Sequence, residues 1–124
     1  MIGVDTSFLI DFFKGNKKAI KLAQEHKELA TCELVNFEFL IGNLTQEQEA
    51  TFLRFINNRP SYALTQEATK QAAKTYREAK QKGKTLPLVD CLIASTYQTH
   101  GITHIATKNN KHFTDIPTIQ TITY

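Results

Sequence analysis

Short apolar runs alternate with amphipathic segments along the whole chain, and this alternation predicts both strands and helices. Runs of four or five residues bounded by polar or turn-forming residues have the length and composition of strands. Longer segments with apolar positions three or four residues apart indicate helices. Strands are expected at residues 1–5, 29–32, 61–64, 103–106 and 119–123, and helices at about 6–14, 17–26, 34–42, 46–59, 66–82 and 87–100.

Residues at the expected helix ends support these boundaries. Thr6 or Ser7 can cap the first helix and Asn16 the second, because their side-chain oxygens accept from free backbone N–H groups. Thr45 and Gln48 have the spacing of a capping box. Because strands alternate with helices, the chain is expected to form a three-layer α/β/α fold of the α/β class, with a parallel sheet of four to five strands.

Three acidic residues lie in unusually apolar surroundings. Asp5 ends the first expected strand, and parallel sheets form ligand sites beyond the carboxyl ends of their strands. Glu38 and Asp90 each lie four residues after the first residue of an apolar helical stripe, at a position where the pattern predicts an apolar side chain. Burying an unpaired carboxylate costs several kcal/mol, so a shared divalent cation is the expected compensation. The two stripes consist of Leu34, Phe37, Glu38 and Ile41, and of Leu86, Val89, Asp90, Ile93 and Tyr97.

Ion pairing with buried Lys or Arg is the alternative explanation for Glu38 and Asp90. No Lys or Arg lies within four residues of either acid, which excludes local pairs and leaves distant ones open. If a metal ion is shared instead, a ligand set of carboxylates alone suits Mg²⁺ or Mn²⁺.

Composition restricts the class of protein. The chain has 124 residues, 41% of them apolar, and is expected to form one domain over residues 1–124. A net charge of +3 permits a polyanionic partner without requiring one. Cys32 and Cys91 lie in apolar segments without the spacing of a zinc site, which favours a reducing, cytoplasmic location. Neither a signal peptide nor a membrane span is expected.

The order of four motifs resembles the PIN domain superfamily, and within it the VapC-type toxins. Each motif alone is short, but together they span the chain in the family's order. They are IGVDTSFLID at residues 2–11, EFLIG at 38–42, GKTLPLVDCLIA at 83–94 and IATKNNKHF at 105–113.

The resemblance implies a metal-dependent endoribonuclease that uses one or two Mg²⁺ or Mn²⁺ ions. Asp5, Glu38 and Asp90 would be the family's three core acids, serving as catalytic residues and metal ligands. Supporting roles are expected for Thr6, Ser7, Thr107 and Asn109, and contacts to RNA phosphates for Lys84, Lys108 and Lys111. His104 and His112 are candidates for a general base, although a lone histidine near a strand end is more often structural.

Two departures from the family pattern point to a site with fewer acids. The fourth acid of many relatives is replaced here by Asn109, and a further acid two positions before Asp90 is replaced by Leu88. These replacements leave open a non-catalytic PIN-like module that binds RNA or protein. A nuclease of the same fold that processes RNA, without being a toxin, is also open.

The resemblance also implies partners. Transfer RNA or ribosomal RNA would be the substrate, and a VapB-like antitoxin would cover the acids with a basic side chain. Homodimerisation is expected too, while no membrane association is. Four apolar residues of the first helix offer a dimer surface or fill the core; these are Phe8, Leu9, Phe12 and Phe13.

Overall fold

A parallel sheet forms the centre of the fold in the computed structural model, which describes residues 1–26 and 28–124. Its five strands lie in the order β3-β2-β1-β4-β5, and every neighbouring pair is parallel. This arrangement confirms the expected α/β class and the parallel sheet. The strands are β1 (Ile2–Val4), β2 (Leu29–Cys32), β3 (Ser61–Tyr62), β4 (His104–Ala106) and β5 (Gln120–Ile122).

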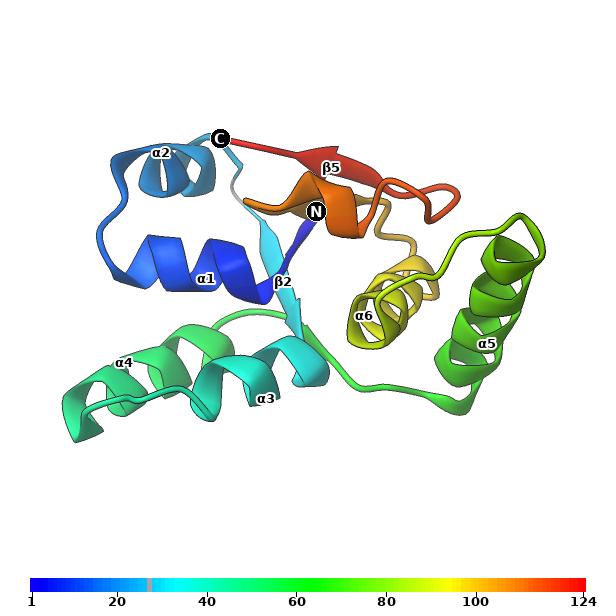
Figure 1. The fold of residues 1–124 in the computed structure, drawn as a ribbon. Coiled ribbons are helices and arrows are strands. Elements are labelled where there is room, and N and C mark those ends of the chain that lie inside the picture. Colours follow the sequence, from blue (N-terminus) through cyan, green and yellow to red (C-terminus); the bar gives the residue numbers. More distant parts are fainter. Residues whose placement is uncertain (27) are drawn as a thin grey trace.

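Helices connect and cover the strands. Figure 1 shows α1 and α2 to one side of the sheet and α5 and α6 to the other, with α3 and α4 beyond the end of β2. All six expected helices are confirmed, and a short 3₁₀ helix follows β4. The bounds are α1 (Thr6–Phe13), α2 (Lys17–Glu25), α3 (Glu33–Leu40), α4 (Gln46–Asn57), α5 (Gln66–Gln81), α6 (Leu88–Gln98) and η1 (Asn110–His112).

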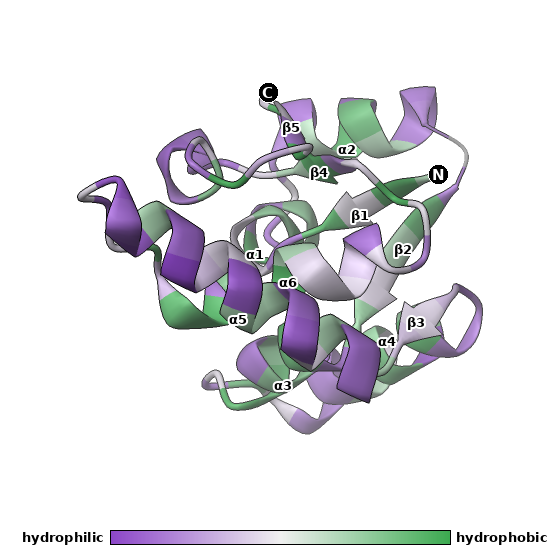
Figure 2. Ribbon diagram, turned by 90° about the vertical axis from the view of Figure 1, so that its right-hand side faces the viewer, coloured by the Kyte–Doolittle hydropathy of each residue, from purple (hydrophilic) through white to green (hydrophobic). Residues whose placement is uncertain are grey.

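The core lies between the sheet and the apolar faces of these helices. Strand residues such as Val4, Ala30 and Ile105 are fully buried. Figure 2 shows the hydrophilic residues of α5 on its outer side, so this helix buries only one face. None of the helices within the described residues is long and apolar enough to cross a membrane.

Close packing of α6 on the sheet fixes the position of β1. The hydroxyl of Tyr97, a fully buried residue of α6, donates to the carbonyl oxygen of Val4 at 2.6 Å. A Cβ atom at Gly3 would lie 2.7 Å from the Tyr97 ring, so only glycine allows this approach. Overpacking of this kind costs about 1–3 kcal/mol. The strand that ends at Asp5 is therefore held directly against the helix that begins near Asp90.

One predicted apolar stripe is wrong and the other is only partly right. In α3, Phe37 and Ile41 are 60% and 68% exposed, while Val35 and Phe39 face the core. Apolar residues surround most of this helix, so the periodicity did not identify its buried face. In α6, Ile93 is buried as expected but Val89 is 41% exposed, because the first turn of the helix extends beyond the core.

Of the four apolar residues of α1 considered from the sequence, two are buried in the core and the other two are half-buried against it. Phe8 and Leu9 are fully buried. Phe13 contacts Phe39, Phe52 and Phe55 in an aromatic cluster between α1, α3 and α4. Packing in the core is confirmed for Phe8 and Leu9, and a dimer surface at Phe12 and Phe13 stays a prediction.

Candidate functional site

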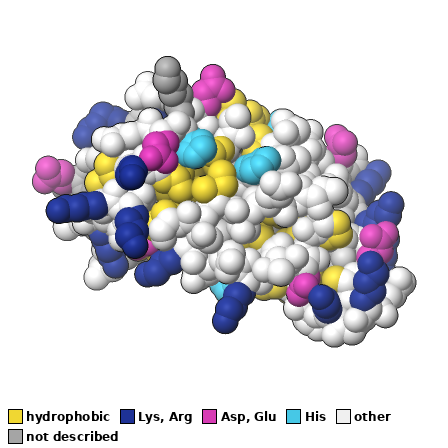
Figure 3. All heavy atoms as spheres, turned by 90° about the horizontal axis from the view of Figure 1, so that it is seen from above, with side chains coloured by type: hydrophobic (Ala, Val, Ile, Leu, Met, Phe, Trp, Pro, Cys, Tyr) yellow, Lys and Arg dark blue, Asp and Glu magenta, His cyan; other side chains and the backbone are white. Residues whose placement is uncertain are grey.

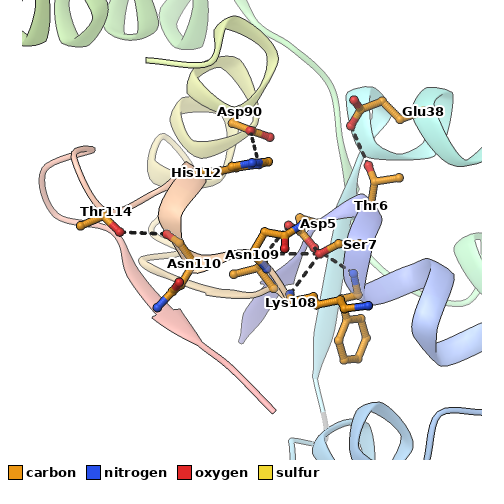
Figure 4. Close-up of polar contacts among 12 residues, drawn as sticks. Asp5, Thr6, Ser7, Glu38, Asp90, Lys108, Asn109, Asn110, His112 and Thr114 are labelled. Atoms are coloured by element: carbon orange, nitrogen blue, oxygen red, sulfur yellow. Dashed lines mark hydrogen bonds and ion pairs between the residues drawn. The ribbon is translucent and has the colours of Figure 1, made fainter. Parts of the chain in front are cut away.

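Asp5 is the most enclosed of the three acids and caps α1. Its residue is only 5% exposed. Oδ1 accepts from the backbone N–H of Phe8 at 2.9 Å and from the Ser7 hydroxyl at 2.8 Å, and Oδ2 accepts from the Thr107 hydroxyl at 2.5 Å (Figure 4). The prediction that Thr6 or Ser7 caps this helix is therefore wrong. The N-cap residue is Asp5, one residue earlier, and its negative charge is favoured at a helix N-terminus.

The turn after β4 is attached to Asp5 through two hydroxyl groups. Ser7 Oγ accepts from the backbone N–H of Lys108, and Thr107 Oγ1 accepts from the backbone N–H of Asn109, each at 3.0 Å. Each hydroxyl thus accepts from the turn and donates to the carboxylate. Thr6 is not part of this network, because it faces α3. Burial of Asp5 and the position of the turn are therefore coupled.

Asp90 lies in the first turn of α6, three residues after the N-cap residue Pro87. Its side chain is 19% exposed, and Oδ2 is 3.1 Å from Nδ1 of His112. Figure 4 shows the imidazole reaching from η1 toward this carboxylate. The partner of Asp90 is thus a histidine, where the alternative considered from the sequence was a Lys or Arg.

Glu38 lies on α3 and is half-buried. Its Oε1 accepts a hydrogen bond of 2.6 Å from the Thr6 hydroxyl. Figure 4 places Glu38 and Asp90 on separate helices, with Asp5 below them at the end of β1. The three acids thus come from α3, α6 and the start of α1, and they surround the carboxyl end of the central strand.

Burial raises the pKa values of Asp5 and Asp90, and like charge raises that of Asp90 further. Loss of solvent raises the pKa of Asp5, and its three hydrogen bonds and nearby His112 offset part of that rise. Loss of solvent also raises the pKa of Asp90, and repulsion by Asp5 and Glu38 adds to it while His112 opposes it. The three carboxylates are therefore close enough to repel one another.

The carboxylates avoid one another in this arrangement. Within residues 1–26 and 28–124, no three Asp, Glu, His or Cys side chains form a compact metal-binding group. Glu38 is turned to Thr6 and Asp90 to His112. Within the same residues, neither Lys nor Arg forms an ion pair with the three acids. The site therefore carries negative charge that lacks a strong cationic partner, as expected of residues that bind a divalent ion.

The other residues predicted for the site differ in their placement. Thr107 and Ser7 contact Asp5 directly, whereas Asn109 is exposed and contributes its backbone N–H. Lys84 forms an ion pair of 2.7 Å with Asp115, so its charge is already partnered. Two lysines are exposed nearby: Lys108 on the turn that contacts Ser7, and Lys111 on η1.

His112 is the site residue that the sequence identified least well. It was one of two histidines considered as a base, and its contact with Asp90 was not expected. Its position at the end of η1, three residues after Asn109, brings it back over the acids. His104, the other candidate, contacts the Thr103 hydroxyl instead. In the sequence, only the closeness of His112 to the turn after β4 indicated that this residue belongs to the site.

Replacing Asp90 with Asn should stabilise the metal-free protein, and increasingly so as the pH rises. A raised pKa means that the folded state prefers the protonated acid, so wild type loses stability as Asp90 ionises above its ordinary value of 3.8. The Asn side chain does not ionise. Melting temperatures measured in EDTA between pH 4 and pH 8 should therefore show a growing advantage for Asp90→Asn. A difference that stays constant, or that favours wild type more at high pH, would contradict this electrostatic account.

Comparison with known proteins agrees with this geometry. The PIN domain family model matches residues 2–118. The VapC ribonuclease Mb1587 of Mycobacterium bovis is 33% identical over 109 residues, which cover 82% of this chain and 81% of that protein. Ribonuclease VapC3 of Methanocaldococcus jannaschii is 29% identical over 94 residues, covering 76% of this chain and 95% of that protein.

Solved structures show the same fold. A toxin-antitoxin complex from Klebsiella pneumoniae has a TM-score of 0.81 at 24% identity, covering 97% of this chain and 96% of that one. VapBC2 from Rickettsia felis, bound to a DNA fragment from its promoter, has a TM-score of 0.82 at 19% identity, covering 100% and 99%. The family match, the similarity to VapC ribonucleases and the shared fold lead to one conclusion: the chain belongs to the PIN domain family.

Proposed function

We propose that this protein is a metal-dependent endoribonuclease and the toxin of a type II toxin–antitoxin pair. The observation that carries the proposal is the buried, hydrogen-bonded Asp5 with Asp90 and Glu38 around it, in a chain 33% identical to a VapC ribonuclease. Asp5, Glu38 and Asp90 are proposed as both the metal ligands and the catalytic residues, over one PIN domain that spans residues 1–124. A cytoplasmic location fits both the proposed substrate and the free, buried Cys32 and Cys91.

The residues present fit Mg²⁺ or Mn²⁺. Asp5 Oδ1 already accepts two hydrogen bonds, whereas Oδ2 accepts one and keeps a lone pair for a cation. Asp90 and Glu38 supply further oxygen ligands of the kind that hard ions prefer. When bound, one or two such ions lower the pKa of water and neutralise charge on a phosphoryl group.

The protein's own contribution is to orient the acids and attract the RNA. Ser7 and Thr107 hold Asp5 in one orientation, and Thr6 holds Glu38. Lys108 and Lys111 place positive charge beside the acids, so contact with phosphates and a loss of affinity at high salt are expected. Elsewhere, on the face seen in Figure 3, the described Lys and Arg side chains gather toward the two ends and are mixed with acids. We therefore assign RNA contacts to the turn after β4.

Loss of any one of the three acids should abolish most RNA cleavage. Asp5→Asn, Glu38→Gln and Asp90→Asn are each expected to lower the Mg²⁺-dependent rate by about 100-fold or more, since each removes a charged ligand. Cleavage of transfer RNA and ribosomal RNA by purified protein measures this effect. Asp11→Asn is the matched control, because Asp11 lies on α1 but contacts Tyr124.

The outcome of that assay also separates the nuclease from a binding module. Near-normal cleavage by Asp90→Asn would exclude the proposed mechanism. RNA binding without cleavage in the wild type would favour the non-catalytic alternative, to which Asn109 and Leu88 point. Cleavage without growth arrest on expression would favour a processing nuclease over a toxin.

An antitoxin is proposed to cover the acids from the side of Glu38. A groove of about 480 Å³ lies between α1, α3 and α4, with Ile10, Phe13, Phe39 and Leu44 in its wall and Glu38 at its edge. An apolar segment of the antitoxin would fill this groove and direct a basic side chain toward the carboxylates. Titration of wild type and Ile10→Glu with the product of a neighbouring short reading frame tests this, because only wild type should form the complex.

A second copy of the chain is proposed to cover the exposed apolar residues of α3 and α6. Phe37, Ile41, Leu88 and Val89 are exposed on these two helices, which contact each other. Phe37→Glu should therefore convert a dimer to a monomer in sedimentation analysis, because burying an unpaired charge in the interface is costly. Leu53→Glu, on an exposed part of α4, is the control and should leave the dimer intact. A wild-type monomer at all concentrations would exclude the dimer.

A further inference from the structure

The contact between His112 and Asp90 has a geometry that suits a shared metal ion. Nδ1 of His112 and Oδ2 of Asp90 are 3.1 Å apart. Ligand atoms at neighbouring corners of an octahedron around Mg²⁺ or an ion of similar size lie about 3 Å apart. The two atoms contact each other directly, and their separation matches that of two ligands of one ion, so binding requires only that both turn toward the ion.

His112 also faces the rest of the acid site. Figure 4 shows its imidazole on the side of Asp90 that faces Asp5, 3.1 Å from the Asp90 carboxylate. The side chain is 52% exposed, so a cation can reach the nitrogen from solvent. By contrast, Asn109 contributes a backbone N–H to Thr107, and its side chain carries no charge for an ion.

We propose that His112 is a nitrogen ligand of the metal ion held by Asp5 and Asp90. The inference rests on the proposed metal site and adds a ligand to it. A site with an imidazole ligand differs from one of carboxylates alone, because Mg²⁺ prefers oxygen whereas transition-metal ions accept nitrogen readily. The site should therefore prefer Mn²⁺ to Mg²⁺, and His112 should account for much of that preference.

Pulsed electron paramagnetic resonance of the Mn²⁺-loaded protein tests the nitrogen ligand directly. The wild type should show ¹⁴N coupling from an imidazole, which changes to ¹⁵N coupling when histidine is labelled. His112→Phe keeps a ring but lacks the nitrogen, so this coupling should disappear. His104→Phe makes the same change at a histidine that contacts Thr103, and the coupling should persist.

Metal titrations followed by melting temperature provide the second readout. In His112→Phe, affinity for Mn²⁺ should fall about tenfold or more, and affinity for Mg²⁺ should change much less. A wild-type circular dichroism spectrum and a single cooperative melting transition of the variant in EDTA would show that the fold is retained.

The possible failures can be told apart. Mn²⁺ binding to wild type without nitrogen coupling, or coupling that persists in His112→Phe, overturns the role of His112 and leaves the carboxylate site in place. Failure of wild type to bind Mn²⁺ at all overturns both this role and the metal-dependent function.

Discussion

Burial of the Asp5 carboxylate is the constraint on which the rest of the site depends. Three hydrogen bonds fix this charge, and they join the start of α1 to the turn after β4. Removing water from a carboxylate costs several kcal/mol unless other charges or donors compensate. Neutral hydroxyl and N–H donors compensate only in part, as the raised pKa of Asp5 shows. Asp90 and Glu38 add negative charge beside it, which lowers stability further and favours the binding of a cation.

The three acids are held apart by separate partners. Each carboxylate has a separate partner: Asp5 the hydroxyls of Ser7 and Thr107, Glu38 that of Thr6, and Asp90 the imidazole of His112. The fold therefore assembles the acids around the end of β1 while the side chains remain apart. The proposed metal site would thus exchange some stability for function, because acids that repel one another lie where the ion is proposed to bind.

Local patterns in the sequence predicted the fold well, because strand runs, caps and helix breakers act over a few residues. The capping box at Thr45 and the strand that ends at Asp5 were both correct. The buried face of α3 was not, because apolar residues lie around most of the helix and only tertiary contacts place Phe39 inward and Phe37 outward. The partner of Asp90 could not be predicted either, since the η1 turn that carries His112 is short and its path depends on contacts with distant residues.

The central claim is that the acids around Asp5 bind a divalent cation that compensates their buried charge. Crystals of the wild-type protein grown with Mn²⁺, measured at the manganese absorption edge, test this most directly. An anomalous peak within bonding distance of Asp5 and Asp90 is expected. Crystals in which Mn²⁺ is present, but whose anomalous peaks all lie away from these two carboxylates, would contradict it.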